Sequence, residues 1–589
     1  MDDLEDVMPR NGTRIPLAPK ILHRFYEPIM LLEALRECVR EHLSVPSQSV
    51  HVNVEDPKQL YQAFVYKLAH ICDREKGGKT VTALMILNMN SLPAFAPEYT
   101  YVFAVNQATP EHLSHTASFL HTVLQKVALA PPATDTEGRT AAERELRQIV
   151  LRFNRPRMKF YLNSLRERAG VCYRHCEMSE DDESAMVIGV LTDLRSSEEF
   201  IINDMTPEAE YDQKCKLVFR KLASIFSDKH LNDIFLARAA AGRSAIEGYT
   251  TMSCWSDLVH TALRILAYRA SVHYCFLARD RWPALFRKNP RIVAVPSADP
   301  QPTPRRNKSL KAEAIVGRMT SNDKLMNIFK RFVQDLQMIH LDFRLSLAYQ
   351  KSPLIVHSEV LLHDWLLTDH GKGEIVPTMF FNKWPYIGSS KPTCKLCKYY
   401  FEESRSGVEH RASHGNLYVK WRLPDVYDFH GPEAVKRRQI MLDRILERVR
   451  KEVFNTIKKK SPQSYKHEDS NTLSATMLLD DRWTQTQTDP ETDSGTRVGS
   501  VRDWAEDGSV IAHRADAEPA PGIINDVDSV KSEADPTDIG ELRGWGRGDG
   551  IDDTDMRTHT GLEGSDYDDE EEDEEDYDDD DDDVGGAVL

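Results

Sequence analysis

Two short motifs late in the chain constrain its folding most, because their side chains suit one shared metal ion. His357 and Glu359 form a His-x-Glu triplet, and Cys394 and Cys397 form a Cys-x-x-Cys pair. Cysteines three residues apart on a helix point to the same side and can bind the same metal. Three protein ligands with a nearby carboxylate are typical of a zinc ion that keeps an open position. We therefore predict Zn²⁺ bound by His357, Cys394 and Cys397, with Glu359 as the proton carrier.

The spacing of these residues also predicts where their helices begin. Residues two apart in mid-helix face different sides, so His357 and Glu359 can share a site only if His357 stands at the helix start. Pro353, close upstream, favours a boundary there. For the second helix we predict Thr393 as the N-cap, with the helix dipole favouring both thiolates.

The information lies in the pairing of the two motifs. A second triplet, His175-Cys176-Glu177, lacks a cysteine pair at a suitable distance, so His-x-Glu alone is uninformative. A Cys-x-x-Cys pair is expected by chance about 0.1 times in such a chain. A closed, purely structural zinc site is the alternative, and it needs a fourth ligand. The candidates for that ligand are His363, His370, His410 and His414.

The overall charge says little about partners of the folded part. The net charge is −18, but sixteen carboxylates lie between residues 566 and 583, which leaves about −2 for the rest. No run of about 18 apolar residues occurs, and the N-terminus lacks the pattern of a secretory signal. The nine cysteines are scattered, as expected for reduced thiols. We expect an intracellular protein, cytoplasmic or nuclear, that is not secreted and has no membrane span.

The first half of the chain has a helical pattern, in which apolar residues recur every three or four positions. Thr109 followed by Pro110 predicts a helix start. Helices are predicted at residues 21–43, 60–71, 141–168 with a break near Pro156, 217–236 and 257–280, and strands at 100–105 and 185–191. These elements predict an α-helical N-terminal domain at residues 15–295, followed by a proline-rich linker at 296–320.

The next part alternates between strands and helices, which favours an α/β layer domain at residues 321–430. Apolar residues alternate with polar ones at 339–347, as in a half-buried strand. The other predicted elements are helices at 323–336, 356–367 and 393–403 and strands at 386–389 and 418–422. A long basic amphipathic helix follows at 431–462, and residues 463–589 form an acidic tail predicted to be disordered.

Together the two motifs resemble the signature of the zinc-dependent cytidine-deaminase-like superfamily, the nucleic acid and nucleotide deaminases. The phrases Tyr-Ile-Gly-Ser-Ser-Lys at 386–391 and Ser-His-Gly-Asn-Leu-Tyr at 413–418 are similar to a fungal branch grouped with deaminases of intracellular bacteria. The resemblance covers residues 335–430. It departs from the usual pattern at Thr393, which stands between Pro392 and the first cysteine.

The resemblance implies an α/β/α sandwich with a central sheet and a hairpin before the first motif helix. Residues 339–347 and 291–295 are the candidate strands of that hairpin. It also implies a hydrolytic deaminase of a nucleobase in a nucleotide or nucleic acid. In such an enzyme a zinc-bound hydroxide attacks the ring carbon bearing the amine, and Glu359 shuttles the proton to the leaving ammonia. His414 and Asn416 are candidates to line the substrate pocket, although a simple turn around Gly415 explains them equally well.

The alternative for the whole protein is a catalytically inactive deaminase fold that acts as a zinc-stabilised interaction module. Protein partners are not predicted.

Two other patterns have simple structural explanations. Gly77-Gly78-Lys79-Thr80 resembles the end of a P-loop, but Asp73 stands where that motif needs glycine, so we predict a helix-breaking turn. The basic helix could track nucleic-acid phosphates, and Lys458-Lys459-Lys460 could be a nuclear signal. A docked amphipathic helix is the first interpretation.

Overall fold

The centre of the fold is a five-stranded mixed sheet built around a hairpin from the first fifth of the chain. β1 (Thr82–Asn88) pairs antiparallel with β2 (Tyr99–Val105) along its whole length. β3 (Arg291–Val295) lies parallel to β2, and β4 (Tyr386–Ser389) lies antiparallel to β1. β5 (Glu409–His410) completes the order β3-β2-β1-β4-β5.

The structure is a computed structural model that describes residues 12–38, 52–88, 98–179, 181–244, 253–304, 311–335, 341–351, 353–370 and 373–459. The predicted tail at 463–589 lies outside these residues. Most described residues are helical, as predicted. No helix within the described ranges is both long and apolar enough to cross a bilayer.

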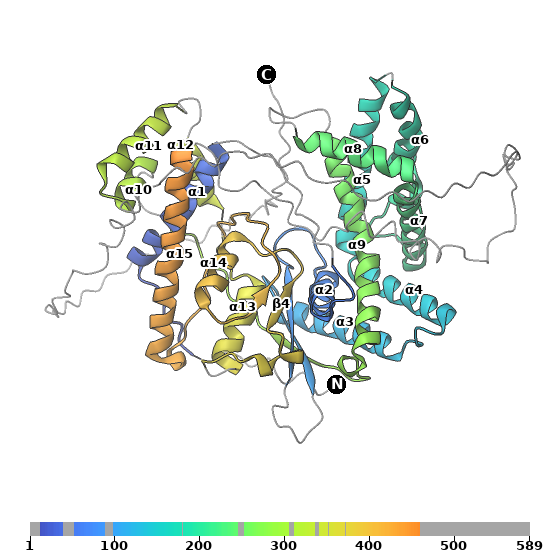
Figure 1. Cartoon of the computed structure of the whole chain (residues 1–589), viewed down its shortest axis with the longest axis horizontal. Coiled ribbons are helices and arrows are strands. Elements are labelled where there is room, and N and C mark those ends of the chain that lie inside the picture. The colour runs from blue at the N-terminus through green and yellow to red at the C-terminus, as the bar shows by residue number, and fades with distance from the viewer. Residues whose placement is uncertain are drawn as a thin grey trace, which may run out of the picture. The chain divides into compact units, whose positions relative to one another are not determined.

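Helices cover both faces of the sheet (Figure 1). Successive strand residues belong in turn to two hydrophobic cores, one on each face, and each core needs a layer of helices to bury it. Leu84 and Phe103 face the first core, whereas Met85 and Val102 face the second. Neighbouring strand residues point to opposite faces, so a strand buried on both sides is apolar throughout. The hairpin is therefore shared between a mainly N-terminal helical layer and a mainly C-terminal one.

The layer beside the first core contains α2 (Pro57–Cys72), α3 (Pro110–Leu129), α4 (Thr136–Phe153), α5 (Arg155–Glu177), α6 (Asp182–Ser196), α7 (Glu208–Ser227), α8 (Lys229–Ser244) and α9 (Ser253–Arg281). The second layer contains α1 (Pro19–Cys38), α10 (Ala312–Met319), α11 (Asp323–Asp335), α12 (Leu341–Gln350), α13 (Ser358–Trp365), α14 (Lys395–Ser404) and α15 (Gly431–Lys459). Among the described residues, the helices α3 to α9 are thus inserted between β2 and β3.

Several predicted boundaries of the N-terminal part are confirmed. Thr109 caps α3, accepting a hydrogen bond from the His112 amide, and the predicted break near Pro156 falls at Asn154 between α4 and α5. The single helix predicted at 217–236 is wrong, because α7 ends at Ser227 and Asp228 caps the start of α8. The strand predicted at 185–191 is also wrong, since these residues lie in α6.

The strand predicted at 339–347 is wrong as well. Residues 341–347 lie in α12, and residues 339 and 340 lie outside the described residues. Leu341, Leu345 and Ala348 are buried at helical spacing, whereas Phe343 and Leu347 are 60% and 40% exposed. The alternation of apolar and polar residues at 339–347 therefore does not correspond to a buried strand face. The hairpin of the sheet is instead β1–β2. Residues 291–295 are a strand, β3, but their place in a hairpin is wrong, because β3 lies parallel to β2.

The sheet takes strands from both sides of the linker predicted at 296–320. Ala83 and Leu84 of β1 pair with Ser389 and Gly388 of β4. α1 likewise packs against α12 and α15. All described residues belong to one compact unit of the chain. The predicted linker thus falls between elements that share one sheet and one core.

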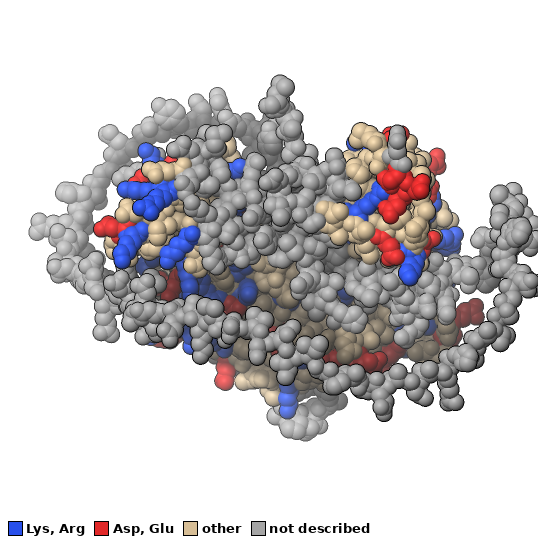
Figure 2. Space-filling model, turned by 45° about the horizontal axis from the view of Figure 1, so that its top comes forward, with Lys and Arg blue, Asp and Glu red and all other residues tan. Residues whose placement is uncertain are grey.

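α15 is a docked amphipathic helix over the described residues, as first interpreted. Arg448 on α15 pairs with Glu402 and Glu403 of α14, and Glu452 pairs with Lys395. Its buried face consists of Ala434, Leu442, Ile445, Leu446, Val449, Val453 and Ile457. In Figure 2, Lys and Arg side chains (blue) lie among Asp and Glu side chains (red) on the coloured surface in view. Part of the basic charge of α15 is therefore used for packing against α14.

Candidate metal centre

His357 stands at the N-cap of α13, where the spacing predicted it. Its backbone is extended, with φ −71° and ψ 145°, and Ser358 is the first helical residue. The segment before it is held by backbone hydrogen bonds from the Ile355 amide to Lys420 and from the Arg422 amide to Ile355. Because His357 is not yet helical, its ring and the Glu359 carboxyl can reach one site.

The cysteine pair opens α14, but the predicted cap was one residue off. Cys394, not Thr393, is the N-cap, and its sulfur accepts a hydrogen bond from the Cys397 amide at 3.5 Å. Thr393 instead bridges to Ser413 in the backbone. The cap position points the Cys394 sulfur across the helix start, where unpaired amides and the dipole favour a thiolate.

The three predicted ligands meet with the spacing that zinc requires. His357 Nδ1 lies 3.5 Å from Cys394 Sγ and 3.3 Å from Cys397 Sγ. A tetrahedral zinc with Zn–S of about 2.3 Å and Zn–N of about 2.0 Å separates nitrogen and sulfur by about 3.5 Å. Within the described ranges, these three side chains form the one group of His, Cys and acidic residues that could hold a metal.

Burial and mutual charge polarise the site. Burial alone raises the pKa of Cys394, but the hydrogen bond from the Cys397 thiol and the charge of His357 lower it well below its usual value. Burial and the neighbouring Cys394 raise the pKa of Cys397. Glu359 is only 4% exposed, and burial raises the pKa of its carboxyl, which contacts the Cys397 thiol. The carboxyl therefore lies beside a ligand sulfur in a place shielded from water.

Trp421 is a site residue that the sequence did not reveal. Its indole Nε1–H donates to Cys397 Sγ at 3.2 Å, and the side chain is fully buried. Residues 418–422 were predicted as a strand, but they form only a single parallel bridge between Trp421 and Ile355. The bridge to Ile355 holds Trp421 in the position from which its indole reaches Cys397. A tryptophan between Lys420 and Arg422 gives no sequence signal for a bond to sulfur.

His414 and Asn416 are both buried, in a turn that packs against the start of α14. The His414 amide donates to the Thr393 carbonyl, and the Asn416 carbonyl accepts from the Lys395 amide. The Asn416 amide donates to His414 Nδ1 at 2.9 Å, and Gly415 between them has a φ of 74°. These contacts account for both residues as parts of a turn, and a role in substrate binding stays a prediction.

The other histidines considered as a fourth ligand have partners of their own. His363 contacts the Tyr400 hydroxyl at 2.9 Å and the Ser406 hydroxyl at 2.8 Å through its two ring nitrogens. His410 Nδ1 lies 2.8 Å from the Arg411 carbonyl oxygen. The His370 ring stacks on Trp365. Among the described residues, the group that could hold a metal thus has three members, His357, Cys394 and Cys397.

The second His-x-Glu triplet lies at the end of α5. Its Cys176 is buried, and Cys176 Sγ accepts a hydrogen bond from Arg238 Nη1 at 3.3 Å. All eight cysteines whose side chains are described are buried and form no disulfide. Apart from Cys394 and Cys397, the described cysteines are thus buried thiols of the core, as expected.

Comparison with known families identifies the class of this segment. Residues 356–425 match a family model described as OTT_1508-like deaminase. The match begins one residue before His357 and includes Glu359, both cysteines and the turn at 413–418. No curated protein and no solved structure matches the chain. Residues 356–425 are thus a deaminase-family domain whose His-Cys-Cys group is suited to zinc.

Proposed function

We propose that the protein is a zinc-dependent hydrolytic deaminase of a nucleobase in a nucleotide or nucleic acid. One observation carries the proposal: His357, Cys394 and Cys397 meet at zinc spacing beside the buried Glu359, inside the segment that matches a deaminase family. A purely structural site has no need of a buried carboxylate at that place. The three-ligand set instead suits an ion that also binds water or substrate.

The residues of the chain divide the work of the reaction. When bound, zinc supplies a water molecule whose pKa is lowered toward neutrality. The two sulfurs and His357 Nδ1 hold the ion, and the Trp421 indole steadies one sulfur by its hydrogen bond. Glu359 accepts the proton of the attacking water on its carboxylate. It passes this proton to the ring nitrogen, then takes the remaining proton from the oxygen now bonded to the ring carbon and gives it to the amine, which leaves as ammonia while that carbon becomes a carbonyl.

The finer family assignment is part of the same proposal. The phrases at 386–391 and 413–418 support the fungal branch grouped with deaminases of intracellular bacteria. Gly388 in the first phrase has a structural reason, because β4 passes close to α2 there. The second phrase is the buried turn against α14. Both phrases thus have structural roles next to the metal ligands, in addition to any contact with substrate.

The proposal is tested by ammonia release from bases, nucleosides and single-stranded oligonucleotides with the zinc-loaded protein. Glu359→Gln should retain zinc in metal analysis but lose about 10²–10⁴-fold in turnover, because it removes the proton carrier and not a ligand. Cys394→Ser should lose zinc. Cys275→Ser, which alters a buried cysteine of α9 in the other helical layer, is the matched control and should retain both zinc and activity.

The outcomes separate the two functions considered. Wild-type turnover in Glu359→Gln would contradict the proposed role of the carboxylate. A zinc-loaded wild type that releases ammonia from none of the substrates, with Cys394→Ser destabilised, would favour the inactive, zinc-stabilised interaction module.

A further inference from the structure

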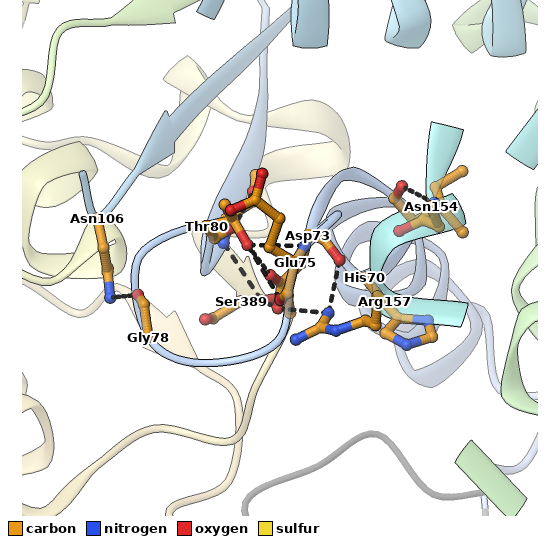
Figure 3. A network of polar contacts seen from close by, with 12 residues as sticks. His70, Asp73, Glu75, Gly78, Thr80, Asn106, Asn154, Arg157 and Ser389 are labelled. Carbon is orange, nitrogen blue, oxygen red and sulfur yellow. Dashed lines mark hydrogen bonds and ion pairs between the residues drawn. The ribbon is translucent and has the colours of Figure 1, made fainter. Parts of the chain in front are cut away.

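The connection between α2 and β1, residues 73–81, touches the segments that carry both metal motifs. This connection contains the Gly77-Gly78-Lys79-Thr80 sequence, and it runs from a helix to a strand, the reverse of a P-loop. Figure 3 shows it as a loop with polar side chains converging on it from several elements. Its hydrogen bonds lead to the His-x-Glu motif on one side and to the Cys-x-x-Cys motif on the other.

The first contact reaches the His-x-Glu motif through Asn106, at the end of β2. The Asn106 side-chain oxygen accepts a hydrogen bond from the Ser358 amide at 2.7 Å. Its amide nitrogen donates to the Gly78 carbonyl at 2.7 Å (Figure 3). Its backbone amide also donates to Val81. Ser358 lies between His357 and Glu359, so Asn106 fixes the first turn of α13 relative to the connection.

The second contact reaches the Cys-x-x-Cys motif through Ser390, four residues before Cys394. The Ser390 hydroxyl donates to Asp73 Oδ2 at 2.9 Å and accepts from the Thr82 amide at 3.2 Å. The Ser390 amide donates to the Thr82 carbonyl at 2.8 Å. The strand end that leads into the first cysteine is therefore fastened to Asp73, which begins the connection, and to Thr82, which directly follows it.

Asp73 holds the connection in shape. Its Oδ1 accepts from the Thr80 hydroxyl at 2.7 Å, and its Oδ2 pairs with Arg157 Nη1 of α5 at 2.9 Å. Both partners of this ion pair are almost fully buried. A buried carboxylate with a cation and two hydroxyl donors is fully satisfied, so its geometry is fixed. α5 belongs to the helices inserted between β2 and β3, which links the insertion to the site.

We propose that the connection at 73–81 positions both halves of the metal centre, with Asn106 and Ser390 as the positioning residues that fasten the two motifs to it. Neither side chain is a ligand. Each acts by fixing the backbone from which ligands project. An asparagine at 106 is suited to this role because one amide group supplies the acceptor for Ser358 and the donor for Gly78. Partners that orient metal ligands typically contribute about 10–100-fold to metal affinity.

This inference rests on the proposed metal centre, and its test uses metal binding so that it does not depend on activity. Cobalt(II) replaces zinc, and its visible absorption reports the geometry of a tetrahedral His-Cys-Cys site. Asn106→Ala should weaken cobalt binding by about 10–100-fold and shift the visible bands. Ser390→Ala, a milder change that leaves the Asp73–Arg157 pair intact, should alter the sulfur-to-cobalt charge-transfer band. It also serves as the test if Asn106→Ala does not fold.

The matched control is Asn154→Ala. Asn154 is also a buried asparagine, but its amide donates to the Ile71 and Val150 carbonyls and contacts neither motif (Figure 3). It should lower the thermal stability and leave the cobalt spectrum unchanged. A wild-type spectrum and affinity in Asn106→Ala and Ser390→Ala, or the same spectral change in Asn154→Ala, would overturn the positioning role. A wild type that forms no cobalt–thiolate bands would overturn the metal centre itself, and with it the proposed function.

Discussion

Lys67 places an amino group inside the protein, where α2 packs against the deaminase-family segment. Its side chain is 4% exposed, and its Nζ lies 5.6 Å from the centre of the Tyr66 ring. The Arg411 guanidinium lies over the same ring at 4.5 Å. Burial, and then the charge of Arg411, lower the pKa of Lys67 to about 7. His70 nearby is also held neutral, because burial and these cations lower its pKa.

This pKa predicts a pH-dependent stability. Between pH 7 and about 10.5 the unfolded chain binds a proton at Lys67 that the folded protein does not, so the stability rises with pH. The slope from this one group is about 1.4 kcal/mol per pH unit. Lys67→Met removes it, so the variant should exceed the wild type in stability at pH 7.5, with the difference shrinking toward pH 9.5. Urea denaturation at several pH values measures both curves.

Lys58→Met is the control for this prediction. Lys58 lies on the same helix, but its side chain is 43% exposed and pairs with Glu409. Its removal should change the stability by less than about 1 kcal/mol at every pH, as is usual for a surface ion pair. Parallel curves for Lys67→Met and the wild type would mean that Lys67 has an ordinary pKa in the folded protein.

At the scale of residues, the sequence predicts what a local motif specifies and misses what tertiary contacts add. His357, Cys394 and Cys397 were found because ligand chemistry restricts both their types and their spacing. Trp421 and Asn106 lie outside the two motifs, and their hydrogen bonds to Cys397 and Ser358 are tertiary contacts that no local pattern specifies. Thr393 was chosen as the cap because hydroxyls are preferred there, whereas a cysteine sulfur fills that position.

At the scale of elements, the approach of β4 to α2 depends on one glycine. A Cβ added at Gly388 would lie 2.8 Å from the Tyr66 backbone nitrogen and 2.8 Å from Val65 Cγ1. Backbone atoms cannot move aside as a flexible side chain can. Gly388→Ala should therefore destabilise the protein by about 1–3 kcal/mol, as expected for overpacking. The midpoint of urea denaturation measures this loss.

Gly317→Ala provides the comparison for that change. Gly317 lies inside α10, and a Cβ there would meet nothing within 4 Å. Alanine in an open helical position should stabilise the protein by about 0.5–1 kcal/mol. Equal effects of the two alanines would show that the contact between β4 and α2 is looser than these distances indicate.

The elements that the sequence mispredicted have a common physical cause. Residues 82–88 were not recognised as a strand because β1 is buried on both faces and so lacks alternation. Residues 341–347 alternate, yet α12 exposes two of their apolar side chains. Periodicity indicates an element only when each apolar residue is buried. α11 was predicted closely because burial and pattern agree in it. β2 and β4 were also predicted closely, although they are as fully buried as β1 and equally lack alternation.

At the scale of the whole molecule, the domain boundary depends on pairings that sequence patterns do not specify. The boundary was predicted at residues 296–320 because the sequence pattern there changes from helical to alternating. β1 and β4, about 300 residues apart in the chain, pair directly, and α1 packs on α15. No local pattern encodes such distant partners. The insertion of α3 to α9 between β2 and β3 made one layered fold resemble two consecutive domains.

This architecture predicts that residues 321–462 cannot fold alone. The fragment would retain all three ligands. It would lack the β1–β2 hairpin on which β4 pairs, the connection at 73–81 and α1. It would expose the unpaired edge of β4 and the apolar faces of α12 and α15, which favours aggregation. We expect it to be insoluble, or to bind cobalt without the bands of the intact site. Residues 12–462 should be soluble, unfold cooperatively and show the spectrum of the full chain. A soluble 321–462 fragment that unfolds cooperatively and binds one zinc ion would contradict this expectation. It would also establish the zinc domain as an independent unit, because the sheet contacts from the first half of the chain would then be dispensable for building the site.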